Sequence, residues 1–181
     1  TQNFAQDLRI SIRGFGARSG FGIRGIQLIV DGIPETTPDG QGQLDNLPLG
    51  LIQSLTVLRG PASSFYGNAS GGVIQINTLE GFEDNFIRLR LQGGNFSSRN
   101  LAATIGLKNN KTKAVFYQNH SESQGYRNHS KYKQQVFNAR VWHDLSESSQ
   151  IRWQFNYTNS PYAYDAGGIN LDMVKENPKQ A

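Results

Sequence analysis

The chain has 181 residues, no cysteine and a formal net charge of +4, and 36% of its residues are hydrophobic. The lack of cysteine excludes a disulfide framework, a thiolate nucleophile and a zinc–thiolate site. The basic residues are scattered along the chain, which argues against nucleic acid as a partner. No apolar run approaches the roughly 18–20 residues of a spanning helix.

The first half of the chain predicts a small globule punctuated by glycine. Residues 8–13 and 27–32 predict strands, the second ending in an Asp-Gly turn. A short helix is predicted over 47–54, because Pro48 lies near its first turn, where a missing N–H costs nothing. The other predicted elements are a long loop over 33–46, a strand over 54–58, a helical turn over 63–66 and a strand over 73–78.

The second half predicts strands that alternate between apolar and polar residues. In residues 86–92 the apolar and polar side chains fall on opposite faces, and residues 151–157 alternate most clearly. The segment 113–121 is ambiguous, because Phe116 and Tyr117 lie on opposite faces. The remaining predictions are strands over 101–107 and 137–145, an aromatic girdle from Trp142, Trp153 and Tyr157, and a loop-like end over 176–181.

The connections between these predicted strands alternate in length. Residues 108–112 and 146–149 form short turns, whereas residues 123–134 and the chain after 159 form long ones. Membrane barrels of the bacterial outer membrane have short inner turns and longer outer loops, so the connection 93–99 is expected on the outer side. A soluble antiparallel sheet with one solvent-exposed face alternates in the same way. The pattern by itself is therefore compatible with a membrane barrel and with a soluble sheet.

Five short motifs occur in a fixed order in the first half of the chain. They are Ile12-Arg13-Gly14, Val30-Asp31-Gly32-Ile33-Pro34, Leu58-Arg59-Gly60-Pro61, Phe65-Tyr66-Gly67 and Gly71-Gly72-Val73-Ile74-Gln75-Ile76-Asn77-Thr78. Each motif is weak alone. Together they resemble the plug domain of TonB-dependent outer-membrane receptors over about residues 8–79.

The resemblance implies a mainly β fold in two parts. A small mixed α/β plug globule, lacking its beginning, occupies residues 1–80, and the first five or so antiparallel strands of a large transmembrane β-barrel occupy residues 81–181. The family barrel has about twenty-two strands. An open sheet edge in lipid would leave unpaired backbone groups, so this chain is expected to be a fragment with an incomplete barrel.

The resemblance also implies a function. The expected protein is a receptor of the bacterial outer membrane that imports a scarce nutrient, most often a ferric siderophore, and it has no enzymatic activity. Its expected partners are that chelate, outer-membrane lipid and the TonB energy-transducing complex, whose binding segment lies upstream of the plug and is expected to be absent here. No intrinsic cofactor is expected, with iron present only within a bound chelate.

Other ligands and another class of protein remain open at this stage. Receptors of the same family for cobalamin, haem, copper or a glycan would share the motifs. A soluble β-rich binding module would share the alternation, and its apolar faces would be covered by protein. A hydrolase would need a nucleophile and a base in one pocket, and Ser63 and Ser64 lack the context of a strained nucleophile. No catalytic residue is predicted.

Ligand contacts are predicted in loops that carry aromatic and charged residues, because these suit an anionic, catechol-like or heterocyclic chelate. His120, His129 and His143 fall on different predicted elements, so no metal site is predicted. The ligand-binding candidates are Arg13, Phe15, Arg18, Pro34, Thr37, Asp39 and Gln41 in the globule, and Tyr126, Arg127, His129, Tyr162 and Tyr164 in the strand connections.

Contacts between plug and barrel are predicted for arginines that share the polar faces of the strands. These are Arg88, Arg90, Arg140 and Arg152, and acidic partners are expected among Asp31, Asp45, Glu80 and Glu83 because buried charges are costly unless paired. The alternative is a solvated wall without specific partners. By resemblance, Arg13 and Arg59 could meet carboxylates of the barrel wall.

Overall fold

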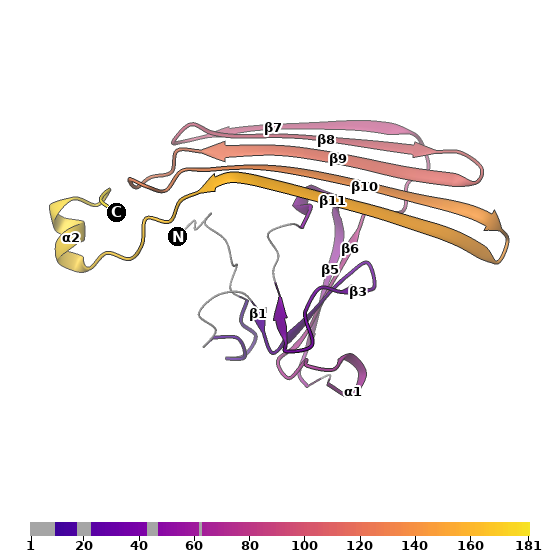
Figure 1. Ribbon diagram of the computed structural model, residues 1–181, viewed down its shortest axis with the longest axis horizontal. Helices are drawn as coiled ribbons and strands as arrows, with labels where there is room; N and C mark the ends of the chain where they lie inside the picture. Colours follow the sequence, from indigo (N-terminus) through magenta and orange to yellow (C-terminus); the bar gives the residue numbers. More distant parts are fainter. Residues whose placement is uncertain (1–9, 18–22, 43–46, 62) are drawn as a thin grey trace. The chain divides into compact units, whose positions relative to one another are not determined.

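The structure is a computed structural model that describes residues 10–17, 23–42, 47–61 and 63–181. It divides into two units at the boundary between Glu80 and Gly81. Strands dominate both units, as Figure 1 shows, so the predicted mainly β fold is confirmed. Within the described ranges no helix has the length and apolar character needed to cross a membrane.

The first unit is built around a four-stranded sheet in the order β3-β2-β6-β5. The two central strands, β2 (Ile26–Val30) and β6 (Gly72–Thr78), are parallel, and the outer strands β3 (Ile33–Pro34) and β5 (Ile52–Arg59) are antiparallel to them. Every residue of β2 is buried. A parallel strand covered on both faces is buried along its whole length, which explains why β2 does not alternate. Its one polar residue, Gln27, is buried as well.

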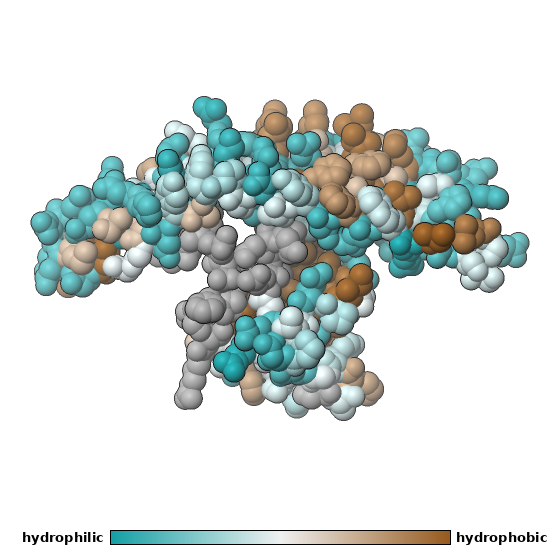
Figure 2. Space-filling view, viewed as in Figure 1, coloured by the Kyte–Doolittle hydropathy of each residue, from teal (hydrophilic) through white to brown (hydrophobic). Residues whose placement is uncertain are grey.

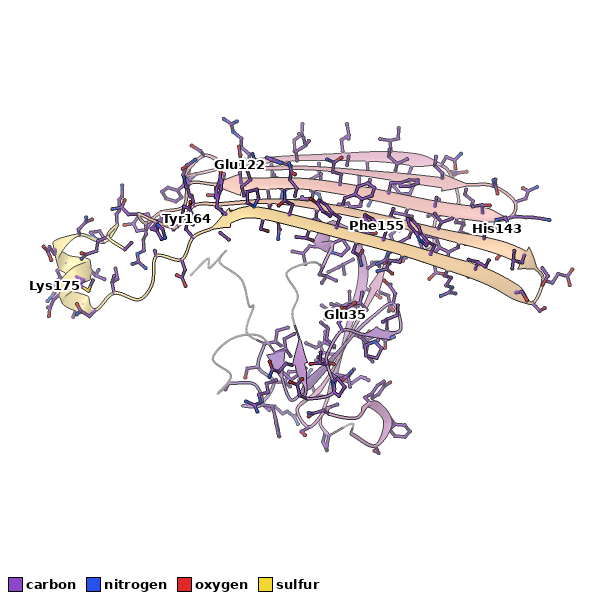
Figure 3. All side chains as sticks on the ribbon, in the orientation of Figure 1. Glu35, Glu122, His143, Phe155, Tyr164 and Lys175 are labelled. Atoms are coloured by element: carbon purple, nitrogen blue, oxygen red, sulfur yellow. The ribbon has the colours of Figure 1, made fainter. Side chains whose placement is uncertain are left out.

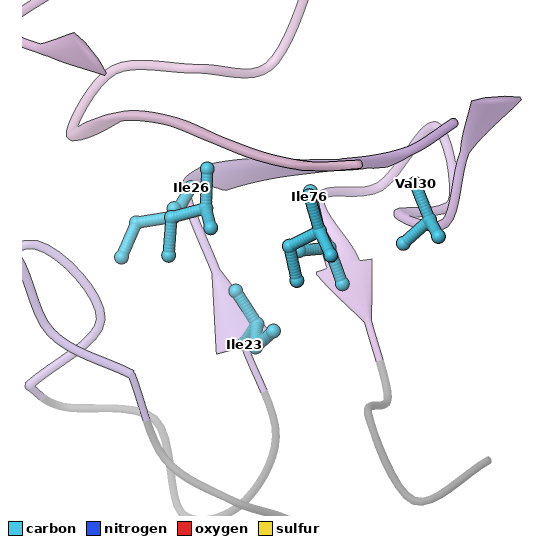
Figure 4. Packing of buried hydrophobic residues seen from close by; sticks show 6 residues of the cluster. Ile23, Ile26, Val30 and Ile76 are labelled. Carbon is cyan, nitrogen blue, oxygen red and sulfur yellow. The ribbon is translucent and has the colours of Figure 1, made fainter. Parts of the chain in front are cut away.

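The core of this unit lies mainly on one face of that sheet. Ile26, Leu28 and Val30 of β2 point to this face and are paired in register with Gly72, Ile74 and Ile76 of β6. Ile23 joins them, and Figure 4 shows the packing. On the opposite face, Ile29 and Val73 pack with Ala69.

The motif Val30-Asp31-Gly32-Ile33-Pro34 forms a tight turn that joins β2 to β3. Both Asp31 (φ 51°) and Gly32 (φ 83°) have positive φ, the conformation of a two-residue type I′ hairpin. The Asp31 carboxylate accepts hydrogen bonds from the backbone N–H of Thr78 (2.7 Å) and from its hydroxyl group (3.0 Å). This side chain therefore ties the end of β2 to the end of β6.

Several predicted elements of the first unit differ from the structure. Residues 10–13 form no strand, because Arg13 (φ 50°) and Gly14 (φ 87°) turn the chain so that Ile12 bridges to Phe15; residues 8 and 9 lie outside the described ranges. The helix predicted over 47–54 is only a 3₁₀ turn, Leu49–Leu51, because β5 begins at Ile52. The long loop contains β3 and β4 (Gln41–Gly42), the latter paired with β1 (Ile23–Arg24).

The helical turn and the last strand of this unit were predicted correctly. Helix α1 spans Ser63–Tyr66, and β6 begins one residue before the predicted strand. The glycine pair Gly71-Gly72, at the start of β6, allows close packing of the backbone. A Cβ atom at Gly72 would lie 2.3 Å from the Leu58 carbonyl oxygen, so the Arg-Gly-Pro strand can approach only a glycine.

The second unit is a five-stranded antiparallel sheet in which each strand pairs with the next in the chain (Figure 1). All five predicted strands are present, and the ambiguous segment 113–121 lies within the third of them. The strands are β7 (Phe86–Gly94), β8 (Ser98–Lys108), β9 (Thr112–Ser123), β10 (Tyr132–Ser146) and β11 (Ser149–Ala163).

A short helix, α2 (Leu171–Glu176), follows β11 where only loop was predicted up to the end of the chain. The Asn170 side chain caps it by accepting a hydrogen bond from the Met173 N–H (2.9 Å). Asp172 in its first turn and Lys175 in its last turn suit the helix dipole. These capping and charge signals were readable in the sequence.

One face of the second sheet, here called the apolar face, carries exposed hydrophobic side chains. The register places Ile87 opposite Ile105, Ile105 opposite Phe116 and Ala139 opposite Phe155. Leu91 is 77% exposed and Ile87 is 73% exposed. Hydrophobic residues gather over this sheet in Figure 2.

The other face, here called the polar face, carries all four of the predicted arginines. Arg88 lies opposite Thr104, Arg140 opposite Gln154, and Arg152 opposite Trp142. Trp142 is buried on this face, so its predicted place in a lipid-facing aromatic girdle is wrong. Trp153 and Tyr157 lie on the apolar face, as the girdle requires, because they occupy the alternate positions of β11.

The core packing of the first unit can be tested by two matched leucine truncations. We expect Leu28→Ala to lower the free energy of unfolding by about 2–5 kcal/mol, because it removes a fully buried side chain and leaves a cavity. Leu49→Ala, at a position 69% exposed, should change it by no more than about 0.5 kcal/mol. Urea unfolding of both variants measures the difference, and equal losses would contradict this account of the core.

Candidate functional site

The second sheet has two unlike ends. At one end β8–β9 and β10–β11 are joined by short turns over 109–111 and 147–148. At the other, here called the loop end, lie residues 95–97, residues 124–131 and the chain after Ala163. Figure 3 shows Glu122 and Tyr164 toward the loop end and His143 toward the other.

The three segments of the loop end are joined by backbone hydrogen bonds. The Gln124 N–H donates to the Phe96 carbonyl (2.9 Å), and the Asn128 N–H donates to the Lys179 carbonyl (2.7 Å). The Tyr164 N–H donates to the Lys131 carbonyl (2.9 Å), so pairing continues past the end of β11. The long connections therefore form one assembly instead of separate loops.

Arg127 lies at the centre of this assembly. Its Nε and Nη2 atoms donate to the Gln180 carbonyl at 2.9 and 2.7 Å, Nη2 also donates to Ala166 at 2.8 Å, and Nη1 donates to Gly167 at 2.6 Å. The rigid fork of a guanidinium group suits such a set of carbonyls. The structure thus gives Arg127 a role in holding the loops together, and its predicted contact with ligand stays a prediction.

Aromatic and cationic side chains gather around this assembly in two groups. In the first, Phe96 and Tyr126 make an edge-to-face contact with centroids 5.6 Å apart, and the Lys179 ammonium group lies 5.9 Å from the Tyr126 ring centroid. This group brings predicted residue Tyr126 together with Phe96 and Lys179, which sequence reasoning missed because they are remote in sequence.

The second group contains the other three predicted residues of the loops. The His129 and Tyr164 rings are stacked with centroids 4.5 Å apart, and Tyr162 lies 5.7 Å from Tyr164. The Lys131 Nζ atom is 5.1 and 5.3 Å from the Tyr162 and Tyr164 centroids. Tyr162 pairs with Lys133, which places it on the side of the apolar face.

Five candidates of the first unit lie on two separate turns. Thr37, Asp39 and Gln41 form a turn in which the Asp39 carboxylate accepts hydrogen bonds from the Thr37 hydroxyl and from the Gln41 N–H (3.2 Å). These hydrogen bonds, that of Thr37 first, lower the pKa of Asp39 below its ordinary value. The carboxylate is therefore ionised at neutral pH and already holds its own turn.

Arg13 and Phe15 belong to the other turn, and Phe15 is 47% exposed. A Cβ atom at Gly71 would lie 2.5 Å from the Phe15 Cβ, so the glycine lets this turn approach the start of β6. Pro34 lies in β3, and Arg18 lies outside the described residues. The structure therefore separates the described candidates of the first unit into two turns and strand β3, and their contact with ligand stays a prediction.

The predicted contacts between plug and barrel also stay predictions. On the polar face, the Arg88 guanidinium carbon lies 5.4 Å from the Phe86 centroid, and the Arg152 Nε donates to the Gln150 side chain (2.8 Å). Arg59 ends β5, Arg90 faces Ala102, and Arg140 is buried. Of the expected acidic partners, Asp31 binds Thr78, and Asp45 lies outside the described residues.

Nothing in the described ranges suits a resident metal ion, since no three His, Asp or Glu side chains gather there. The chemistry available at the loop end is that of binding: stacked rings, ammonium groups near aromatic faces and backbone carbonyls already bound by Arg127. No nucleophile paired with a base is found among these contacts.

Comparison with known proteins bears on both units. Residues 1–73 match the family model described as the TonB-dependent Receptor Plug Domain. Three solved structures resemble the chain at low sequence identity. They are the pyoverdine outer membrane receptor FpvA from Pseudomonas aeruginosa PAO1 (15% identity, TM-score 0.65), the copper transporter OprC (20%, 0.65) and the ferric-catecholate import receptor Fiu from E. coli K12 (15%, 0.66).

These matches cover 86%, 82% and 86% of this chain but only 23%, 25% and 20% of the respective solved chains. The chain thus spans about a quarter or less of the length of the structures it resembles. At these identities the likeness concerns the fold, and it extends beyond the plug into the strands of the second unit.

Residues 1–73 belong to the family of TonB-dependent receptor plug domains. The antiparallel strands that follow share the fold of the corresponding part of the similar structures. The resemblance found in its sequence motifs is confirmed.

The role of Arg127 can be tested by a conservative substitution. We expect Arg127→Lys to speed amide hydrogen exchange at Asn128 and over residues 164–180 by about tenfold or more, because an ammonium group cannot reach three carbonyls at once and each charged hydrogen bond contributes roughly 1.5–3 kcal/mol. Mass-spectrometric hydrogen exchange measures this. Arg99→Lys is the control, and an equal effect of both substitutions would contradict a special role for Arg127.

Proposed function

We propose that this chain is part of an energy-coupled receptor of the bacterial outer membrane that imports a scarce nutrient. The nutrient proposed first is a ferric siderophore. The observation that carries the proposal is the joint presence of a TonB-dependent receptor plug domain and strands with an exposed apolar face. In this proposal the plug controls passage of the nutrient, and the apolar face contacts lipid. Binding and gating are the whole of the chemistry, with no bond made or broken.

Transport would proceed in two steps. The ligand first binds at the loop end and at the exposed turns of the plug, where aromatic and charged side chains are available. The TonB complex then pulls on a segment upstream of the plug, and the plug yields a path for the ligand. Iron enters as part of the chelate and needs no ligand from the protein.

The siderophore is favoured among possible ligands for two reasons. Two of the similar structures named above are, by name, receptors for pyoverdine and for ferric catecholates. The loop end also combines Tyr126 with the Lys179 ammonium group, a pairing that suits flat, anionic chelates. Copper is the second candidate, because another similar structure is a copper transporter. Cobalamin, haem and glycans are the alternative ligands that the competition test below includes.

Contact of the apolar face with lipid can be tested by placing the same charge on each face of the second sheet. We expect Phe155→Arg to lower the folded fraction of the intact protein in the outer membrane, because arginine on a lipid-facing position costs roughly 2–4 kcal/mol near the bilayer midplane. Gln92→Arg, on the polar face opposite the uncharged Asn100, should have little effect. The folded fraction is measured from membrane extracts by electrophoresis without heating.

This pair of variants also separates the membrane receptor from a soluble binding module. A soluble module would be recovered without detergent. Equal tolerance of arginine at both positions would exclude the lipid contact on which the proposed function depends.

The ligand can be tested by competition in cells that carry the intact protein. We expect uptake of a radioactive ferric catecholate to be competed by other ferric chelates and not by cobalamin, haemin, a copper chelate or a glycan. Tyr126→Ala should weaken chelate binding by about two- to thirtyfold, since a cation–aromatic site contributes roughly 0.5–2 kcal/mol. Tyr157→Ala, on the apolar face, is the matched control. Competition by one of the other ligands would reassign the receptor.

A further inference from the structure

A row of charged residues crosses the apolar face where its hydrophobic side chains end. In register across four strands, Arg99 of β8 pairs with Glu122 of β9, Glu122 with Lys133 of β10, and Lys133 with Tyr162 of β11. Leu91 and Leu101 pair with each other on the same face, two residues closer to the middle of the sheet than Arg99. The hydrophobic surface therefore passes into charge within two residues.

The row has an excess of positive charge. The Arg99 Nη1 atom is 3.9 Å from a Glu122 carboxylate oxygen, and His120 Nε2 is 3.7 Å from the other. Lys133 faces Glu122 across the strand pair, and Lys131 lies at the Tyr162 and Tyr164 rings. Three permanent cations and one carboxylate thus lie along this row, and the Arg99 side chain is 77% exposed.

The opposite edge of the apolar face differs. There Thr112, His143 and Ile151 are in register, and the Thr112 hydroxyl group is 2.8 Å from His143 Nδ1. Lys108 and Lys113 are near that end but pair on the polar face. The cations are thus concentrated at the loop end, beside tyrosines that favour the boundary between lipid and water.

We propose that Arg99, Lys131 and Lys133, together with Tyr162 and Tyr164, bind the phosphate group of a membrane-lipid headgroup. This inference rests on the proposed contact of the apolar face with lipid. One step of two residues along a strand is about 7 Å, so the cations lie at headgroup depth when Leu91 and Leu101 lie among acyl chains. Guanidinium and ammonium groups are the side chains that pair with phosphate.

The proposal gives Tyr162 and Tyr164 a role in lipid contact in place of the predicted contact with the nutrient. Their rings lie beside Lys131 on the side of the apolar face, where they anchor the sheet at the lipid boundary. The nutrient then depends on other residues of the loop end, Tyr126 among them.

The test is the affinity of the intact protein for phosphatidylglycerol in a neutral detergent, measured by native mass spectrometry. The double variant Arg99→Gln, Lys133→Gln should bind this lipid about thirtyfold more weakly, or about fivefold for each cation. Glu122→Gln should bind it more tightly, because the one carboxylate is lost. The control is Lys108→Gln, Lys113→Gln, which removes the same charge from the polar face and should leave the affinity unchanged.

Three results would overturn the inference. They are an unchanged affinity in the double variant, an equal loss in the control, and displacement of the lipid by millimolar inorganic phosphate, which would indicate a site for the free ion. Failure of the proposed function would be separate. It would show as absent chelate uptake, or as tolerance of Phe155→Arg, in the otherwise unmodified protein.

Discussion

Continuous pairing of β7 to β11 is the constraint on which the second unit depends. In hydrocarbon every backbone N–H and C=O needs a partner, and only paired strands supply one without a helix. Once the strands are paired in register, period-two alternation sorts their side chains to two faces. One face is hydrophobic and exposed, and the other holds the four arginines. The proposed contact with lipid depends on that sorting, as does the gathering of the arginines on one face.

The first unit follows a different physical rule. Its central strands are parallel, and β2 is buried along its whole length, so its burial shows no alternation. The residues of its motifs fix the conformation and packing of the backbone. Asp31 and Gly32 make the hairpin turn, Asp31 binds Thr78, and Gly72 admits the neighbouring strand. The residues that resemble the receptor family most are thus those that allow a small plug to be built with tight turns.

The loop end places a structural arginine beside the side chains that are proposed to bind ligand. As a cation in a loop, Arg127 was predicted to bind an anionic ligand. Its N–H groups instead donate to carbonyl groups of the chain. Tyr162 and Tyr164 lie with Lys131 toward the apolar face, whereas Tyr126 packs with Phe96 and Lys179. A preformed assembly of loops gives a ligand a surface that loses less conformational freedom on binding.

The sequence by itself determined the strands of the second unit and the resemblance to receptor plugs, because these depend on local periodicity and on glycines with a fixed conformational role. It failed for residues 10–13, where a turn overrides alternation, and for Trp142, whose lipid-facing role was assumed although its position in β10 placed it on the polar face. Only the tertiary structure decided which distant side chains meet. The grip of Arg127 on Gln180 and the row from Arg99 to Tyr162 depend on strand register, which relates residues far apart in the chain.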